Sequence, residues 1–184
     1  MKNLPLLTPD RTEGLIHDVV LRPLRVNADP RGILVETLRT DWPDVYDPDN
    51  RPFAQCYYSR TEPGVARDEA QWHVHQHQED RFLCIAGQLV VAIYDWRRES
   101  PTAGRLNLFH IGPDAPGDGQ FIVLIPRQTL HGFLVTGPAP GTLLNYPTRL
   151  YNPDDEGRIP FAAVGAALPD GTPFSWQLVR ETLG

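Results

Sequence analysis

The stretch Arg81-Phe-Leu-Cys-Ile-Ala-Gly-Gln-Leu-Val-Val-Ala-Ile-Tyr94 decides the fold class of this chain. It holds two apolar runs of strand length, Arg81–Ala86 and Leu89–Tyr94, with a turn signal at Gly87 between them. No long segment carries the helical period of about 3.6 residues. Comparable runs recur at intervals of roughly ten to fifteen residues, at Gly32–Leu38, Phe53–Ser59, Arg105–Ile111, Gln120–Ile125, Gly132–Thr136 and Thr142–Tyr146. We therefore expect an all-β sandwich or barrel.

The rest of the chain indicates one domain with few helices. Its 15 glycines and 19 prolines are spread along the sequence and punctuate many short elements. Neither a linker nor an internal repeat divides the 184 residues, so we expect a single domain over residues 1–184. Asp41–Arg51 and Pro113–Gly119 have the composition of loops, and Phe174–Leu183 is a candidate for one short helix.

Charge and cysteine content exclude several classes of function. Lys plus Arg is 17 and Asp plus Glu is 23, a net charge of −6 without a basic block, which argues against a general nucleic-acid binder. A few local arginines could still hold one small phosphorylated ligand. An apolar run of about 18 residues, as a membrane span needs, does not occur, and the start is too short and proline-broken for a signal peptide. We interpret Cys56 and Cys84 as core thiols of a cytoplasmic protein.

A histidine-rich stretch, Gln71-Trp-His-Val-His-Gln-His-Gln-Glu-Asp-Arg81, is the main candidate for chemistry. If it is extended, five side chains project to one face, namely His73, His75, His77, Glu79 and Arg81. Such a face is either a solvated edge with hydrogen-bonded histidines or a functional site. A fourth histidine, His131, follows a strand candidate and a proline, which favours the functional interpretation.

The spacing H-x-H-x3-E, followed later by P-x4-H, resembles the two signature motifs of the cupin superfamily. That resemblance implies a cupin-type double-stranded β-helix, a jelly-roll barrel with few short helices. It also implies four inward side chains that can hold a divalent metal, His73, His75, Glu79 and His131. Three imidazoles and one carboxylate suit Fe, Mn, Ni or Zn. Because Val135 stands in place of the usual asparagine, the motif supports the fold more strongly than a metal.

A longer series of motifs runs in order from about residue 29 to residue 175. Asp29–Glu36 has the pattern D-x-R-G-x-x-x-E, and Gln55–Ser59 has the pattern Q-x-N-x-S with Tyr57 in place of asparagine. The later matches are D-x-R at Asp95, S-P-T-x-G at Ser100, H-G-F at His131 and T-x-x-Y-x-P-x-x-E from Thr148 to Glu156. This series resembles the dTDP-4-dehydrorhamnose 3,5-epimerase family, a metal-free branch of the cupins.

The resemblance implies an enzyme that needs no cofactor and acts on a nucleotide-linked 4-keto-6-deoxy sugar. A neutral histidine removes an acidic hydrogen beside the ketone, an enolate forms, and a proton returns from the opposite face. The resemblance places the base at His73, puts Arg81 where the family has a lysine, and puts Asn145 where it has a tyrosine acid. The positions matching substrate contacts are Arg31, Glu36, Gln55, Arg67, His131, Tyr151 and Glu156.

The acid position leaves three hypotheses open, because Asn145 cannot supply a proton at neutral pH and the adjacent Tyr146 would face the other side of its strand. The chain is an epimerase with His73 as its base, a metal-dependent cupin, or a catalytically impaired sugar-nucleotide-binding protein. For Arg31 and Glu36 the structural alternative is an ion pair at a turn, and for Tyr151 it is a packed core aromatic.

We also expect a homodimer, because barrels of this kind leave sheet edges that a second subunit covers. Val19–Val26 is the strand candidate that would bridge the two subunits.

Overall fold

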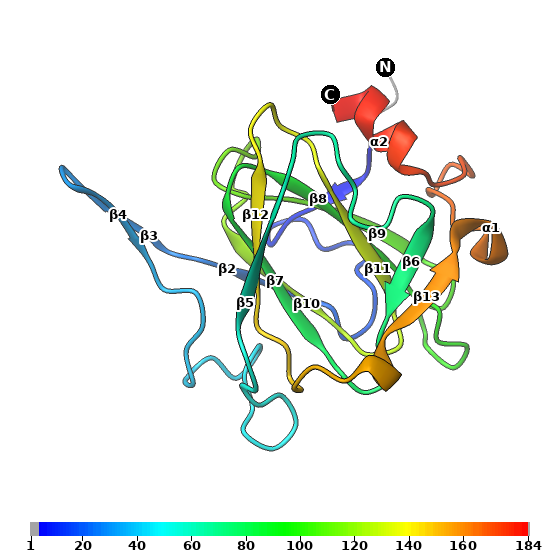
Figure 1. Cartoon of the computed structure of the whole chain (residues 1–184), viewed down its shortest axis with the longest axis horizontal. Coiled ribbons are helices and arrows are strands. Elements are labelled where there is room, and N and C mark those ends of the chain that lie inside the picture. The colour runs from blue at the N-terminus through cyan, green and yellow to red at the C-terminus, as the bar shows by residue number, and fades with distance from the viewer. Residues whose placement is uncertain (1–3, 184) are drawn as a thin grey trace.

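Two β-sheets face each other in the computed structural model, which describes residues 4–183 (Figure 1). The strands are β1 (Leu6–Leu7), β2 (Val20–Pro23), β3 (Val26–Asp29), β4 (Gly32–Val35), β5 (Tyr57–Thr61), β6 (Gln71–Val74), β7 (Asp80–Ala86), β8 (Leu89–Tyr94), β9 (Leu106–Ile111), β10 (Phe121–Ile125), β11 (Leu130–Val135), β12 (Gly141–Asn145) and β13 (Gly157–Pro160). The helices are the short η1 (Pro153–Asp155), α1 (Phe161–Val164) and α2 (Trp176–Leu183).

The strand order brings distant parts of the sequence together. One sheet has the order β1-β9-β8-β11-β6-β13 and the other has the order β2-β10-β7-β12-β5. Apart from the parallel pair of β1 and β9, the strand pairs of the two sheets are antiparallel. Strands make up 38% of the chain and helices 8%, so the prediction of an all-β fold with few short helices is confirmed.

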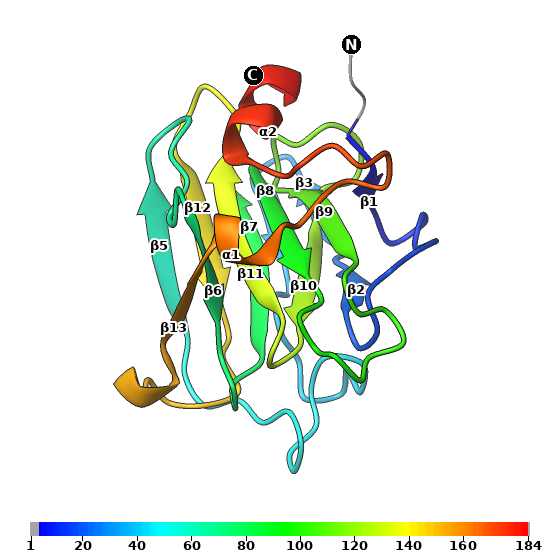
Figure 2. The same cartoon turned by 90° about the vertical axis from the view of Figure 1, so that its right-hand side faces the viewer.

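Two layers of apolar side chains explain why several strands read as unbroken hydrophobic runs. Along β8, Val91 and Ile93 point between the sheets, whereas Val90 and Ala92 pack on the outer face of the six-stranded sheet. Helix α2 covers that outer face (Figure 2), and its Trp176 is buried against it. Because both faces of β8 are covered, both sets of alternate residues must be apolar.

The residues Arg81–Tyr94 form all of β8 and all of β7 except its first residue, and Gly87 makes the turn between the two strands. Gly87 has φ +71°, in the left-handed region, and a Cβ there would lie 2.6 Å from the backbone oxygen of Pro140. The C-terminal helix candidate is also present as α2. The prediction of one strand over Val19–Val26 is wrong. The strand is interrupted between β2 and β3, where Leu24 is buried and its backbone N–H donates to the backbone oxygen of Gln120.

The D-x-R and S-P-T motifs belong to the scaffold. The Asp95 carboxylate is buried and accepts hydrogen bonds from Arg97 Nε (2.8 Å), Ser100 Oγ (2.6 Å) and Thr102 Oγ1 (2.6 Å). Burial opposes ionisation, yet these three partners hold the pKa of Asp95 below its ordinary value. Arg97 also reaches Asp18, so this cluster ties the N-terminal segment to the barrel.

Strands β3 and β4 form a two-stranded hairpin that projects away from the barrel (Figure 1). Ile33 and Leu34 on this hairpin are each 63% exposed. Across residues 4–183, none of the helices has the length and apolar content needed to cross a membrane. The prediction of two core thiols is half wrong, because Cys84 is buried whereas Cys56 is exposed just before the edge strand β5.

Candidate active site

A cavity of about 310 Å³ opens between the two sheets. The six-stranded sheet contributes His73 from β6 and His131 from β11, and the five-stranded sheet contributes Tyr57 from β5. Further polar lining comes from Arg67, Asp68, Glu156 and Arg158. The lining therefore combines imidazoles, a phenol, carboxylates and guanidinium groups, which is the equipment for binding an anionic ligand and moving protons on it.

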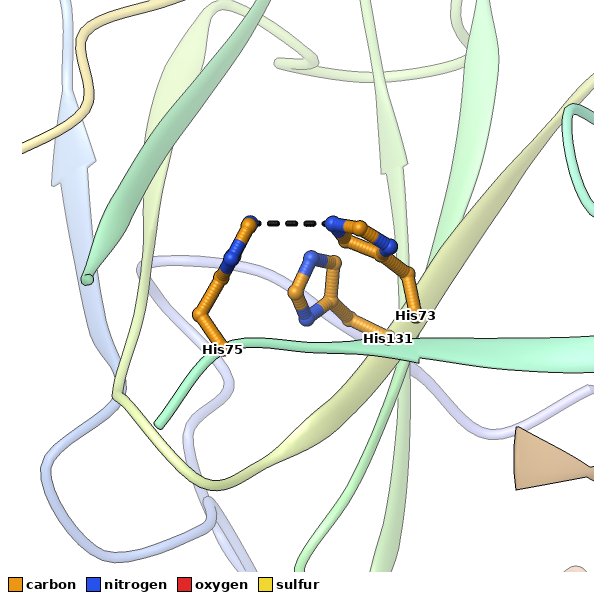
Figure 3. Close-up of side chains that lie close together, drawn as sticks. All are labelled: His73, His75 and His131. Carbon is orange, nitrogen blue, oxygen red and sulfur yellow. Dashed lines mark hydrogen bonds between the residues drawn. The ribbon is translucent and has the colours of Figure 1, made fainter. Parts of the chain in front are cut away.

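Three histidines lie close together beside this cavity, and Figure 3 shows them with the hydrogen bond between His73 and His75. His73 and His131 are direct partners across β6 and β11, and His75 follows at the end of β6. One ring nitrogen from each histidine lies within 4.8 Å of the other two. His75 and His131 are buried, and His73 is partly open to the cavity.

The hydrogen bonds define which nitrogen of each ring carries a proton. His75 Nδ1 lies 2.8 Å from the backbone oxygen of Asp155, so it donates, and His75 Nε2 accepts. His73 Nε2 lies 2.9 Å from His75 Nε2 and therefore donates to it, while His73 Nδ1 accepts from the guanidinium of Arg158. Both rings are neutral in this network. Burial, followed by the neighbouring His131, His75 and Arg158, lowers the pKa of His73 to about 2, so the neutral form is the resting one.

His131, like His75, is held through Nδ1 by a backbone oxygen. Its Nδ1 lies 3.3 Å from the backbone oxygen of Thr129 and donates to it. Its Nε2 is buried, has no hydrogen-bond partner, and lies 3.4 Å from Asp80 Oδ2. Nε2 and the Asp80 carboxylate thus face each other, an arrangement that a proton or a cation shared between the two atoms would stabilise.

Asp80 is a site residue that the sequence analysis missed. Its Oδ1 accepts hydrogen bonds from Gln78 Nε2 (2.9 Å) and Asn145 Nδ2 (2.8 Å). Burial disfavours the charged carboxylate, but interactions with His131 and His75 and the bond from Asn145 hold the pKa of Asp80 at about 2. The signal was present in the alternation of β7, since Asp80 shares a side with Phe82 and Cys84, which are core residues.

The prediction that five side chains of the histidine-rich stretch share one face is wrong, because β6 ends at Val74 and the chain turns before β7 begins. His77 is exposed, and Glu79 forms an ion pair with Arg51 at 2.9 Å. Arg81 lies on the outer side of β7, buried, where its guanidinium donates to backbone oxygens including that of Tyr146 (2.8 Å). The group that enters the site from β7 is thus the Asp80 carboxylate in place of the expected Arg81 guanidinium. The same geometry places Asp80, and not Glu79, beside His75 and His131.

Asn145 is fully buried beneath the cavity and joins two functional side chains. Its Nδ2 donates to Asp80 Oδ1 and to Tyr57 Oη (2.9 Å), and its Oδ1 accepts from the backbone N–H of Arg81 (3.0 Å). The neighbouring Tyr146 points to the other side of β12, as expected, and bonds to Thr37. Tyr57 was not among the predicted site residues. The signal was its place in the Q-x-N-x-S pattern, where it replaces asparagine.

The structure brings some of the predicted substrate contacts into the cavity and leaves others outside. Arg67, His131 and Glu156 line it, and Glu156 Oε2 lies 3.6 Å from His73 Nε2. Arg158 lines it as well and was missed by the sequence analysis. Four predicted positions lie outside, namely Arg31 and Glu36 on and beside the projecting hairpin, Gln55 against the backbone of Arg149, and the exposed Tyr151.

The structure also bears on the structural alternatives for three of these outlying residues. Arg31 pairs with Asp29, and Glu36 pairs with Arg39, so the two do not form an ion pair with each other. Tyr151 is 68% exposed and is not a core aromatic.

Comparisons with a family model and with known proteins agree on one family. Residues 13–168 match the family model described as dTDP-4-dehydrorhamnose 3,5-epimerase. The chain is 47% identical over 149 residues to a probable low-salt glycan biosynthesis epimerase, Agl13, of Haloferax volcanii, which covers 79% of this chain and 88% of the relative. It is 33% identical over 149 residues to the spore coat polysaccharide biosynthesis protein SpsL of Bacillus subtilis, with 80% and 91% covered.

Solved structures agree with the fold. A dTDP sugar isomerase from Desulfovibrio desulfuricans G20 superposes with a TM-score of 0.71 at 26% identity, covering 88% of this chain and 92% of that one. A dTDP-6-deoxy-D-glucose-3,5-epimerase from Legionella pneumophila, solved with dTDP-4-keto-L-rhamnose, gives 0.65 at 25% identity, with 77% and 72% covered. The prediction of a cupin-type jelly-roll barrel is confirmed.

Proposed function

Because the chain belongs to the dTDP-4-dehydrorhamnose 3,5-epimerase family, we propose that it epimerises a nucleotide-linked 4-keto-6-deoxy sugar by removing a proton beside the ketone. The observation that carries this proposal is a neutral histidine, His73, in a polar cavity with the guanidinium groups of Arg67 and Arg158. The family is one of cofactor-independent epimerases, so the chain's own side chains supply the chemistry.

The two guanidinium groups suit the diphosphate of a sugar nucleotide. Guanidinium groups bind phosphate oxygens through paired N–H donors. Arg158 now donates to His73 Nδ1, and its side chain is 39% exposed, so a bound diphosphate can draw it away. That movement would free the Nδ1 lone pair of His73 to accept a proton from the sugar.

His75 provides the support that a base of this kind needs. It accepts from His73 Nε2–H and is itself fixed by the backbone oxygen of Asp155. When His73 takes a proton, the resulting imidazolium keeps this hydrogen bond, and the Asp80 carboxylate lies 3.6 Å from His75 Nε2.

The experiment is deuterium uptake from heavy water into a dTDP-4-keto-6-deoxy sugar, followed by NMR. We expect uptake beside the ketone with wild-type protein and none with His73→Ala. His77→Ala is the matched control, because that side chain is exposed and should leave uptake unchanged. A wild-type protein that exchanges neither the C3 nor the C5 hydrogen contradicts the proposed reaction.

A second candidate function is a divalent-cation site, favoured by the cluster of His73, His75 and His131, two of which, His75 and His131, also lie near the Asp80 carboxylate. The three imidazoles fit a transition metal, with Asp80 close to two of them, and Nε2 of His131 has no hydrogen-bond partner that would compete with a metal. A cation there would polarise the ketone oxygen of a bound substrate. Elemental analysis tests this candidate: bound metal should be lost in His75→Ala and kept in Glu79→Gln, and metal-free wild-type protein with full sugar-nucleotide binding removes it.

We propose that the chain forms a homodimer. The projecting hairpin of β3 and β4 exposes Ile33 and Leu34, and it carries Arg31, which is 89% exposed. Covering the hairpin with a second subunit would bury its apolar side chains and bring Arg31 to the partner. Light scattering at micromolar concentration should give the mass of a dimer, and a monomer contradicts this arrangement.

The two free thiols suit a reducing compartment, which supports a cytoplasmic location.

A further inference from the structure

The proposed reaction needs a proton donor on the face of the sugar opposite to the base, and Asn145 cannot be that donor. We propose that Tyr57 is the catalytic acid of this protein and returns the proton to the carbon that His73 has deprotonated. This inference rests on the proposed epimerase function and adds a residue to its machinery.

The position of Tyr57 meets the geometric requirement. His73 stands on β6 of the six-stranded sheet, and Tyr57 stands on β5 of the five-stranded sheet, so the two line one cavity from opposing sheets. A sugar ring held between the sheets would present one face to the imidazole and the other to the phenol. Side chains on opposing walls are what inversion at a carbon requires, because removal and return of the proton occur from opposite sides.

The hydrogen bonding of Tyr57 leaves its proton available. Its oxygen accepts from Asn145 Nδ2 at 2.9 Å, and Asn145 is held by the backbone N–H of Arg81. Since the Tyr57 oxygen is the acceptor in this bond, its own O–H can donate to a ligand in the cavity. Asn145 therefore positions the phenol without consuming its proton.

The neighbouring hydroxyl groups of Ser59 and Tyr58 are less suited than Tyr57 to donate the proton. Ser59 also lines the cavity from β5, but an aliphatic hydroxyl is a far weaker acid than a phenol. Tyr58 is 71% exposed on the other side of the same strand. Burial and the nearby Asp80 raise the pKa of Tyr57 to about 12, which keeps it protonated at rest, and the cation of Arg67 favours the phenolate that forms on donation.

The role of Tyr57 as the acid explains two departures of this sequence from the family pattern. Tyr57 stands where the family pattern has asparagine, and Asn145 stands where it has a tyrosine acid. These two positions are direct partners in the pairing of β5 and β12. Exchange of the two side chains thus moves the phenol across one strand spacing, about 4.8 Å, and keeps it in the same wall of the cavity.

The step balances without any further reactant. His73 takes the proton from carbon, the C–H electron pair becomes part of the enolate, and the enolate carbon forms a new C–H bond with the proton of Tyr57. The products are imidazolium and phenolate, and water restores both by carrying a proton from one to the other. No oxidant or reductant is involved.

The test compares deuterium uptake with net inversion, using dTDP-4-keto-6-deoxyglucose in heavy water and NMR. Tyr57→Phe should keep uptake and should lower the rate of inversion by about 100-fold or more, the usual effect of a general acid. Tyr58→Phe, the matched control on the exposed side, should match wild type in both. As a second measurement, 3-fluorotyrosine at position 57, whose phenol is more acidic, should move the alkaline limb of the inversion rate to lower pH without moving that of uptake.

Each outcome decides the assignment. Unchanged inversion in Tyr57→Phe, alongside wild-type uptake, overturns the role of Tyr57 and leaves the epimerase function standing. Equal loss of uptake and inversion in Tyr57→Phe, or an unmoved limb with fluorotyrosine, also overturns it, because a merely structural role predicts those results. Absence of uptake in wild type refutes the epimerase function itself, and the assignment falls with it.

Discussion

Replacing Asn145 with alanine should destabilise the fold through the charge that Asn145 supports. The side chain is fully buried and makes three hydrogen bonds, to Asp80 Oδ1, Tyr57 Oη and the N–H of Arg81. A hydrogen bond to a buried carboxylate contributes about 1.5–3 kcal/mol, and an orphaned buried N–H costs about 1–3 kcal/mol. We therefore expect Asn145→Ala to lower the free energy of unfolding by roughly 3–5 kcal/mol, which for a domain of this size lowers Tm on the order of 10 °C.

The pH dependence of this effect follows from Asp80. The pKa of Asp80 is about 2 in the folded protein, against an ordinary value of 3.8. A carboxyl group with a depressed folded pKa stabilises the protein above its unfolded pKa, and that contribution is lost as the pH falls through the folded pKa. Without the bond from Asn145 the folded pKa rises, so acid unfolding of Asn145→Ala should begin at a higher pH than in wild type.

Urea denaturation followed by circular dichroism, at pH 7 and at a series of pH values down to 3, measures both effects. Asn27→Ala is the matched control, because Asn27 is exposed on the projecting hairpin and makes one hydrogen bond to a backbone oxygen at 3.3 Å. A loss below about 1 kcal/mol in Asn145→Ala, or an unchanged onset of acid unfolding, would refute the view that Asn145 supports the buried Asp80 charge.

Three further outcomes follow from the scaffold. Gly87→Ala should lower the free energy of unfolding, measured by urea denaturation, by more than about 1 kcal/mol. The φ of Gly87 is +71°, and a Cβ there would lie 2.6 Å from the backbone oxygen of Pro140. A variant as stable as the wild type would contradict this tight turn. Arg81→Met should lower Tm, measured by differential scanning calorimetry, because several backbone oxygens lose their hydrogen-bond donor. The affinity of the folded variant for a sugar nucleotide should be unchanged. A loss of affinity at unchanged Tm would show that Arg81 acts in the binding site. Asp95→Asn should cost about 1–2 kcal/mol at pH 7. The pKa of Asp95 is lowered in the folded protein, so this cost should shrink as the pH falls below the ordinary range of a carboxyl group and through the folded pKa. A cost in chemical denaturation that does not shrink with falling pH would argue against a charge effect.

The sequence alone determined the fold class, the family and the two principal histidines. Short apolar runs and the turn at Gly87 depend on local rules of strand length and backbone conformation, which act within a few residues. The ordered motifs place His73 and His131 in strands whose identity is local as well. For that reason β7, β8 and α2 lie close to where their patterns put them.

Only the tertiary structure decided which residues face the cavity. The strand β6 ends at Val74, and the turn that follows reverses the alternation assumed for the histidine-rich stretch, so Asp80 enters the site while Glu79 and Arg81 turn outward. A shift of one residue moves a side chain to the opposite face of a sheet. The sequence pattern does not define at which residue a new strand, and with it a new alternation of side chains, begins after a turn. The pairing of Tyr57 with Asn145 is equally invisible locally, because the two stand on strands far apart in the chain that become neighbours only when β5 joins β12.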